Sequence, residues 1–347
     1  MCFTAHGPFF IYTIPVNIVT AYEMLAVEGL EGDHDHIIET VLSKLFLRGD
    51  FVHKIYKHRE GDFADLTDKE IRRAYVSEDF FWNNAMASDI YLELRHVQRD
   101  GDIFIHVDEC DAEDWYIVMK KVDTSRDLMH ILERGVPEKK KLEGYVRTLR
   151  ERLTELTKHR RDSLALFFSA GEAHVKDEIR AVFPWAYTAT PILTHDEVAH
   201  IEKLIASTLE HCPYWNTPIE SMSVVVDNNP ENILFLDEGV SFIDVMPPKD
   251  AWRVHDRYFS LCRTSADISA LAGSDYTEVL HDTYAEEGDL PPRQVRAVYE
   301  IAAALIQVPY RKMIGRDDLA LRYADYLRTR VRELEAMVGF QSSNEVS

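Results

Sequence analysis

The apolar pattern of this chain changes once, near Val122, and that change restricts the possible folds more than any other feature. Before it, short runs rich in β-branched and aromatic residues alternate with turns, which predicts strands at residues 41–47, 51–56, 102–107 and 115–122. After it, apolar residues recur at helical spacing over residues 142–157, 195–209, 292–308 and 316–337. The pattern predicts an α+β protein in which a small antiparallel sheet precedes a larger, mostly helical part.

The length of the chain agrees with this division. The chain has 347 residues, and domains of about 150 residues are usual. We therefore expect an N-terminal lobe at residues 1–122, a helical C-terminal lobe at residues 123–340 and a polar tail at residues 341–347. Arg48-Gly49-Asp50 separates the first two predicted strands at hairpin spacing, and Thr194 with Glu197 forms a capping box before one of the long helices.

A long helix is predicted inside the N-terminal lobe. It opens with a capping box in which Thr67 and Glu70 satisfy each other's backbone amides. Its predicted apolar face consists of Ile71, Tyr75, Glu78 and Trp82. Because a carboxylate on an apolar face is costly unless a cation pairs with it, Glu78 is expected to pair with Lys54 on a strand of the same lobe. The alternative is that both side chains reach solvent.

The charge balance argues against one class of partner. The chain has 39 Lys and Arg against 60 Asp and Glu, a formal net charge of −21, and the acidic residues are spread along the sequence. Broad binding to a phosphate backbone requires clustered basic residues, so we expect no nucleic acid partner. A cationic ligand would suit this balance, although acidic surfaces also serve solubility alone.

The cysteines and the apolar start of the chain bear on its compartment. The four cysteines lie far apart and form no paired motif, which predicts neither a zinc site nor a disulfide scaffold and favours a reducing cytoplasm. The apolar segment at residues 8–27 is interrupted by Asn17 and Glu23 and follows no basic region. We therefore predict no signal peptide and no membrane span.

The residues with the clearest chemistry lie in a β-rich insert at residues 224–245. The insert reads as strand, polar loop, strand, turn and strand, and it places Asp227, Asn232 and Asp244 at strand ends. Asn and Asp oxygens without His or Cys suit Mg²⁺ rather than zinc, so Asn232 and Asp244 are candidate metal ligands. Asp227 is then left to accept the proton of an attacking hydroxyl or to hold that hydroxyl in line with a phosphoryl group.

The spacing D-x-x-x-x-N followed by a hydrophobic-Asp strand resembles the catalytic and metal-binding arrangement of protein-kinase-like phosphotransferases. Over nearly the whole chain, the sequence resembles the aminoglycoside phosphotransferase-like branch, whose loop typically reads H-G-D-x-H-x-x-N. It looks closest to an uncharacterised bacterial group described as aminoglycoside phosphotransferase family enzymes. The resemblance implies a two-lobed protein-kinase-like fold that binds ATP and Mg²⁺ and phosphorylates a small-molecule hydroxyl.

Further segments carry the same resemblance. Residues 39–43 and 46–55 are similar to that group's E-T-H-I-S and L-x-G-x-x-x-K-I segments. By this match Lys54 would contact phosphates, Glu78 would be its helix partner, and the loop from Thr40 to Ser43 would be a glycine-poor phosphate loop. The run ending at residue 122 joins the two lobes, so its backbone around Met119 is a candidate hinge that binds adenine.

The chain departs from the family pattern at its catalytic loop. Val225 and Val226 stand where His and Gly usually precede the aspartate, and Asn229 stands where His, Arg or Lys is common. A lost charge near the transferring phosphate would lower the rate of a preorganised site. These departures keep open the alternative of a pseudokinase-like nucleotide-binding regulatory protein. Separately, inverted placement of ATP in the same cleft would transfer a nucleotidyl group instead of a phosphoryl group.

Overall fold

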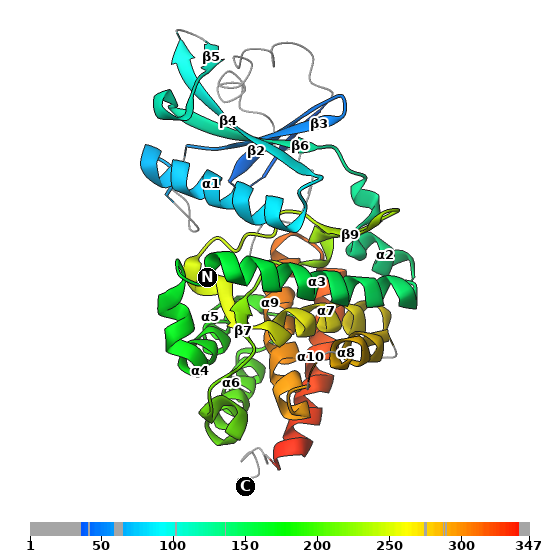
Figure 1. Cartoon of the computed structure of the whole chain (residues 1–347). Coiled ribbons are helices and arrows are strands. Elements are labelled where there is room, and N and C mark those ends of the chain that lie inside the picture. Colours follow the sequence, from blue (N-terminus) through cyan, green and yellow to red (C-terminus); the bar gives the residue numbers. More distant parts are fainter. Residues whose placement is uncertain are drawn as a thin grey trace. The chain divides into compact units, whose positions relative to one another are not determined.

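The computed structural model describes residues 36–40, 42–58, 65–100, 103–135, 137–273, 276–286, 288 and 290–339. The apolar segment at residues 8–27 and the polar tail at 341–347 lie outside these residues. The chain divides into two compact units. The β-rich unit contains the described residues up to Thr124 together with Ser241–Pro248, and the helical unit contains Ser125–Val240 and the described residues from Lys249 onward (Figure 1). The sequence had assigned Ser241–Pro248 to the helical part.

The β-rich unit contains a six-stranded antiparallel sheet in the order β1-β2-β3-β6-β4-β5 (Figure 1). Its strands are β1 (His36–Glu39), β2 (Ser43–Arg48), β3 (Phe51–Tyr56), β4 (Tyr91–Asp100), β5 (Ile103–His106) and β6 (Asp114–Lys120). The predicted hairpin between β2 and β3 is confirmed, and Gly49 adopts the positive φ of +55° that its tight turn requires. β4 is not among the strands that the sequence predicts.

Helix α1 (Lys69–Met86) packs against β4 and β6. It begins one residue later than predicted, because Asp68 is the N-cap and its side chain accepts hydrogen bonds from the backbone amides of Glu70 and Ile71. Its buried face also differs from the predicted one. The buried residues are Arg72, Tyr75, Val76, Asp79, Trp82, Asn83 and Met86. Ile71 is exposed, so the apolar stripe is rotated relative to the prediction.

The helical unit is built from nine helices among the described residues. They are α2 (Leu128–Arg134), α3 (Lys139–Arg160), α4 (Ala165–Arg180), α5 (Phe183–Ala186), α6 (His195–His211), α7 (Arg257–Ala272), α8 (Thr277–Ala285), α9 (Arg293–Met313) and α10 (Asp317–Val338). The four predicted long helices are confirmed as α3, α6, α9 and α10, and the Thr194–Glu197 capping box is present. α9 is buried along most of its length, where α7 and α10 pack against it.

The insert between α6 and α7 has the predicted alternation of strands and loops. β7 (Met222–Val224) pairs with β10 (Val254–Asp256), and β8 (Ile233–Leu236) forms a two-stranded sheet with β9 (Gly239–Phe242). Short 3₁₀ turns are η1 (Glu109–Asp111), η2 (Thr124–Arg126), η3 (Tyr187–Ala189), η4 (Pro213–Asn216), η5 (Pro230–Asn232) and η6 (Asp250–Arg253). The loop from Val225 to Asn232 therefore connects β7 to β8. Over the part of the chain described, no helix has the length and apolarity needed to cross a bilayer.

Candidate functional site

Lys54 lies in the middle of β3, where its neighbours across the sheet are Leu45 on β2 and Ile117 on β6. The residue is only 5% exposed, so its ammonium group needs partners within the protein. Among the described residues it has two: Nζ lies 3.0 Å from Oδ2 of Asp79 and 2.9 Å from Oδ1 of Asp244. All three side chains belong to the β-rich unit. Segments far apart in sequence thus converge on one lysine.

The helix partner of Lys54 is Asp79, and the predicted pairing with Glu78 is wrong. Asp79 is 2% exposed and lies on the buried stripe of α1, whereas Glu78 is half-buried and accepts a hydrogen bond from Nε1 of Trp82 at 3.1 Å. Adjacent residues of a helix are about 100° apart, so a stripe rotated by one position exchanges one carboxylate for the other. The physical argument for a buried carboxylate paired with Lys54 holds, with the neighbouring residue in that role.

Asp244 follows β9 and has a φ of +50°, a conformation that is uncommon outside glycine. Two contacts hold the backbone there: the amide of Asp244 donates to the Tyr91 hydroxyl at 2.9 Å, and the amide of Val245 donates to Oδ1 of Asn83 at 3.0 Å. The same Asn83 donates through Nδ2 to Oδ1 of Asp79 at 2.9 Å. Asn83 therefore fixes both carboxylates around Lys54 relative to each other. The sequence analysis assigned no role to Asn83, Tyr91 or Asp79.

The electrostatics of this cluster keep Lys54 charged. Burial alone would lower the pKa of Lys54, but the carboxylates of Asp244 and Asp79 raise it well above its ordinary value of 10.5. Burial also raises the pKa of Tyr91 above its ordinary value of 10.0, so its hydroxyl stays neutral. The cluster contains one ammonium and two carboxylates, a formal excess of one negative charge.

The predicted phosphate loop is a closed turn in the described residues. The Thr40 amide donates to the Ser43 carbonyl at 2.9 Å, and the Ser43 amide donates to the Thr40 hydroxyl at 2.9 Å. The ammonium of Lys57 donates to the Thr40 carbonyl at 2.5 Å and pairs with Glu39 at 2.7 Å. Residue 41 lies outside the described residues. A phosphate-binding role for Thr40 and Ser43 stays a prediction.

The predicted hinge segment forms the end of β6. Met119 is 8% exposed and lies opposite Val52 on β3. The amide of Lys120 donates to the Ile90 carbonyl, and that of Lys121 donates to the Asp50 carbonyl, each at 2.8 Å. These two amides are therefore engaged within the unit. An adenine ring at this strand end would have to use carbonyl oxygens or other amides, and the role of Met119 stays a prediction.

Asp227 lies in the helical unit, on the loop between β7 and β8. It is 4% exposed, and its Oδ1 accepts a hydrogen bond of 3.0 Å from Nη2 of Arg263 on α7. Asn232 is fully buried, and its Nδ2 donates to the Asp227 carbonyl at 2.9 Å. The backbone amide of Asn232 also donates to the backbone carbonyl of Asn229 at 2.8 Å, which closes the turn. The structure thus brings the predicted catalytic residue and one predicted metal ligand together.

The residues that differ from the family's catalytic loop fall into two kinds of environment. Val225 and Val226 are buried, and the Val225 amide donates to the Arg253 carbonyl at 2.9 Å, so these residues anchor the loop. Asn229 is 4% exposed, and its Oδ1 accepts hydrogen bonds from Nη2 of Arg263 at 3.2 Å and from Nε2 of Gln307 at 3.0 Å. Sequence reasoning missed Arg263 and Gln307, because no local motif connects these helices to the loop.

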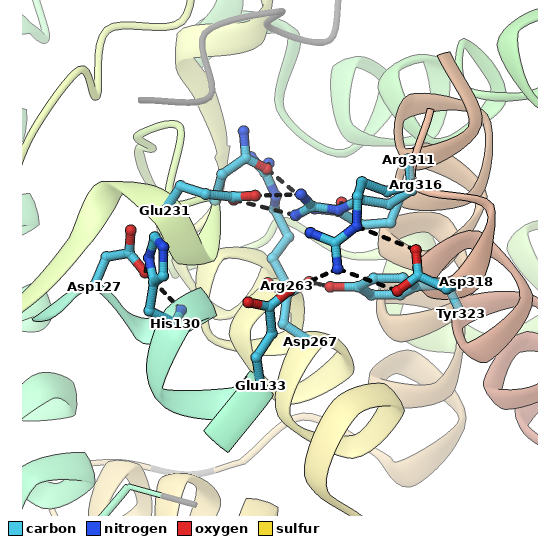
Figure 2. A network of polar contacts seen from close by, with 12 residues as sticks. Asp127, His130, Glu133, Glu231, Arg263, Asp267, Arg311, Arg316, Asp318 and Tyr323 are labelled. Carbon is cyan, nitrogen blue, oxygen red and sulfur yellow. Dashed lines mark hydrogen bonds and ion pairs between the residues drawn. The ribbon is translucent and has the colours of Figure 1, made fainter. Parts of the chain in front are cut away.

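A buried ion pair holds the next part of the loop. Nη2 of Arg311 on α9 lies 3.1 Å from Oε2 of Glu231, and its Nη1 also binds this carboxylate (Figure 2). Nε of Arg311 donates to Oε1 of Gln307, one helical turn earlier, at 3.1 Å. Loop residues 227, 229 and 231 are therefore each held by a side chain of α7 or α9. The loop is positioned by the scaffold itself.

The residues proposed as metal ligands have the donor chemistry that Mg²⁺ prefers. The amide nitrogen of Asn232 is used as a donor, so its oxygen is the atom suited to a cation, and the Asp244 side chain is 22% exposed. Asn232 and Asp244 belong to different units. In the described segments, no three or more His, Cys, Asp and Glu side chains form a cluster that could hold a metal. Mg²⁺ commonly takes one or two protein oxygens and completes its shell with water and phosphate, so the oxygen of each residue, taken by itself, suits it.

Comparisons with known proteins identify the fold. No protein-family model matches the chain, and no curated protein matches it in sequence. The solved GDP complex of wild-type aminoglycoside 2'-phosphotransferase-IIIa is similar, with 12% identity and a TM-score of 0.53 over 91% of this chain and 98% of that chain. A choline/ethanolamine kinase family protein from Mesorhizobium loti matches with 14% identity over 90% of each chain, at a TM-score of 0.43. The first likeness confirms the predicted fold: this chain has the protein-kinase-like α+β fold of an aminoglycoside phosphotransferase.

Proposed function

We propose that this chain is an ATP- and Mg²⁺-dependent phosphotransferase that moves a γ-phosphoryl group to a hydroxyl of a small molecule. The observation that carries the proposal is the position of Lys54 between Asp79 and Asp244. A buried lysine held by two carboxylates contributes little net stability, because desolvation offsets the attraction. Charged groups whose pKa values are strongly perturbed are concentrated at functional sites, where they meet a ligand.

Lys54 would bind phosphate oxygens. An ammonium group has three N–H donors, and the described residues engage two of them, through Asp79 and Asp244. The third can donate to a phosphate oxygen while the two carboxylates fix the direction of the side chain. Thr40 and Ser43 would contact the phosphates from the neighbouring turn, and the strand end at Met119 would bind the base.

The metal would be held by Asp244 and Asn232. When bound, Mg²⁺ supplies charge neutralisation to the phosphates during transfer. The excess negative charge of the Lys54 cluster favours a divalent cation at Asp244. Asp227 would accept the hydrogen bond of the attacking hydroxyl and orient it toward the phosphorus. Most of the rate would then come from positioning.

The test is transfer from labelled nucleotide by the purified chain. ATP and GTP are offered separately with Mg²⁺ and a panel of aminoglycosides, amino alcohols and sugars, and the labelled product is identified by mass spectrometry. We expect turnover with at least one acceptor, and a loss of about a hundredfold or more in Lys54→Met and in Asp227→Asn. Turnover that survives in Asp227→Asn would contradict the proposed role of this residue.

The same experiment separates the alternatives. Nucleotide binding without transfer or hydrolysis would favour the regulatory, pseudokinase-like reading that Val225, Val226 and Asn229 raise. A product that gains the mass of AMP, instead of the mass of a phosphoryl group, would favour nucleotidyl transfer. The acidic composition motivates including cationic acceptors in the panel. The reducing cytoplasm, which the cysteine spacing favours, is the proposed compartment.

A further inference from the structure

Arg263 is a cation beside the predicted catalytic aspartate, and neither the family pattern nor the loop sequence points to it. Through a single nitrogen, Nη2, it donates to Oδ1 of Asp227 at 3.0 Å and to Oδ1 of Asn229 at 3.2 Å. The Arg263 side chain is 15% exposed and the Asp227 side chain is 6% exposed. Charges that are this close and this shielded interact far more strongly than charges in water.

The other charged groups around Arg263 are already engaged. Glu231 pairs with Arg311, and Asp267, one turn along α7 from Arg263, accepts a hydrogen bond from the Tyr323 hydroxyl at 2.7 Å (Figure 2). Burial raises the pKa of Asp267 to about 7, although the Tyr323 hydrogen bond and the charges of Arg311 and Arg263 oppose the shift. Asp267 therefore carries only part of its charge near neutral pH.

We infer that Arg263 is a positioning residue for Asp227: it fixes the orientation of this carboxylate and keeps it ionised, and it supplies from α7 the positive charge that the loop lacks at Asn229. The inference rests on the phosphotransfer proposed above. An aspartate that receives a hydroxyl hydrogen bond must be ionised and correctly oriented before the substrate arrives. The bridge from Arg263 to both Asp227 and Asn229 provides both conditions without a basic residue in the loop.

The test measures the titration of the Asp227 carboxyl group by NMR in protein labelled with ¹³C at the aspartate carboxyls. Asp227→Asn identifies the signal. In Arg263→Gln, we expect the titration midpoint of Asp227 to rise by about one pH unit or more, because a neighbouring guanidinium favours the charged carboxylate by about that much. Adding Asn229→Arg to this variant should lower the midpoint again, because it restores a cation at the loop.

Gln307→Leu is the matched control. It removes the other donor to Asn229 but no charge, so the Asp227 midpoint should stay at the wild-type value. Arg263→Lys keeps the charge and should also stay close to wild type. An unchanged midpoint in Arg263→Gln, an equal rise in Gln307→Leu, or a rise of about a full unit in Arg263→Lys would each overturn the inference.

A kinetic measurement follows where turnover is found. We expect Arg263→Lys to lower kcat by about tenfold or more with little change in the KM for nucleotide, since a lysine cannot bridge both acceptors. A higher KM with unchanged kcat would instead indicate a ligand contact. The NMR readout does not depend on turnover. A shifted midpoint in a protein that transfers nothing would therefore support the role of Arg263 and refute the proposed function.

Discussion

Replacing Lys54 with Met should expose how strongly its two carboxylates depend on it. The substitution keeps a flexible apolar side chain but removes the ammonium group, and it leaves Asp79 and Asp244 without their shared cation. Removing one partner of a buried ion pair costs about 3 to 5 kcal/mol. The Asp79 side chain is 3% exposed and that of Asp244 is 22% exposed, so solvent relieves only the second carboxylate. We therefore expect the free energy of unfolding to fall by about 3 kcal/mol, the lower end of that range.

The assay is urea unfolding of the full chain, in which tryptophan fluorescence monitors the unfolding of the β-rich unit. A double-mutant cycle is measured in the same way. Lys54→Met combined with Asp79→Asn should cost about 2 kcal/mol less than the sum of the single changes, because the two residues are in direct contact. Glu78→Gln is the matched control on the adjacent residue of α1, and its effect should add to that of Lys54→Met. Additivity with Asp79→Asn, or coupling to Glu78→Gln, would refute the assignment of the partner.

The pH dependence of this loss has a definite sign. The pKa of Lys54 is raised above its ordinary value of 10.5, so its contribution to stability is fully present below that value. The contribution is lost only as the pH rises through the elevated pKa. The difference in the free energy of unfolding between wild type and Lys54→Met should therefore be constant from neutral pH to about pH 10. It should shrink in acid, as the carboxylates take up protons. A difference that already vanishes near pH 8 would refute the reasoning.

Three further predictions test the helical unit. The pKa of Asp267 is about 7 against an ordinary 3.8, so its stabilising contribution is full below the ordinary value and is lost as the pH rises to about 7. Between about pH 5 and pH 8, the free energy of unfolding of Asp267→Asn, measured with urea, should therefore rise by about 3 kcal/mol relative to that of wild type. Arg311→Met should cost about 3 to 5 kcal/mol by leaving Glu231 buried and unpaired, and Glu231→Leu in the same chain should recover much of that loss in a thermal unfolding scan. Thr194→Ala should cost about 1 kcal/mol in the same measurement, since it removes the capping box of α6, and no loss would contradict its role as a cap.

Local patterns predicted most of the fold. The long helices α3, α6, α9 and α10 have apolar residues at regular helical spacing, and the β2–β3 hairpin has a glycine at its turn. β4 was missed because only Tyr91 and Val97 are well buried among its residues with described side chains, and the stretch between them, around Glu93 and Arg95, is exposed and charged. A strand with such a polar middle lacks the alternation on which sequence prediction relies.

The candidate site was predicted where its residues form a motif and missed where they do not. Asp244 follows from a strand pattern and Lys54 from the family resemblance, and the structure places them in contact. Glu78 was chosen over Asp79 because Ile71 was counted as buried, although the N-cap lies one residue later than the sequence indicated. Arg263 reaches the loop from a helix 36 residues further along the chain. Contacts of that kind depend on tertiary packing and have no local signature.

Residues 241–248 belong to the β-rich unit although they follow much of the helical unit in sequence, and this has a consequence for biosynthesis. The ribosome completes the six strands long before it produces Asp244, so during that interval Lys54 lacks one of the two counter-ions that the described residues give it. The N-terminal unit is therefore encoded first but completed only after much of the helical unit has emerged from the exit tunnel. A gene fragment that stops at residue 124 would yield a sheet without the carboxylate that completes its lysine cluster, and expressing this unit alone would require grafting residues 241–248 onto it.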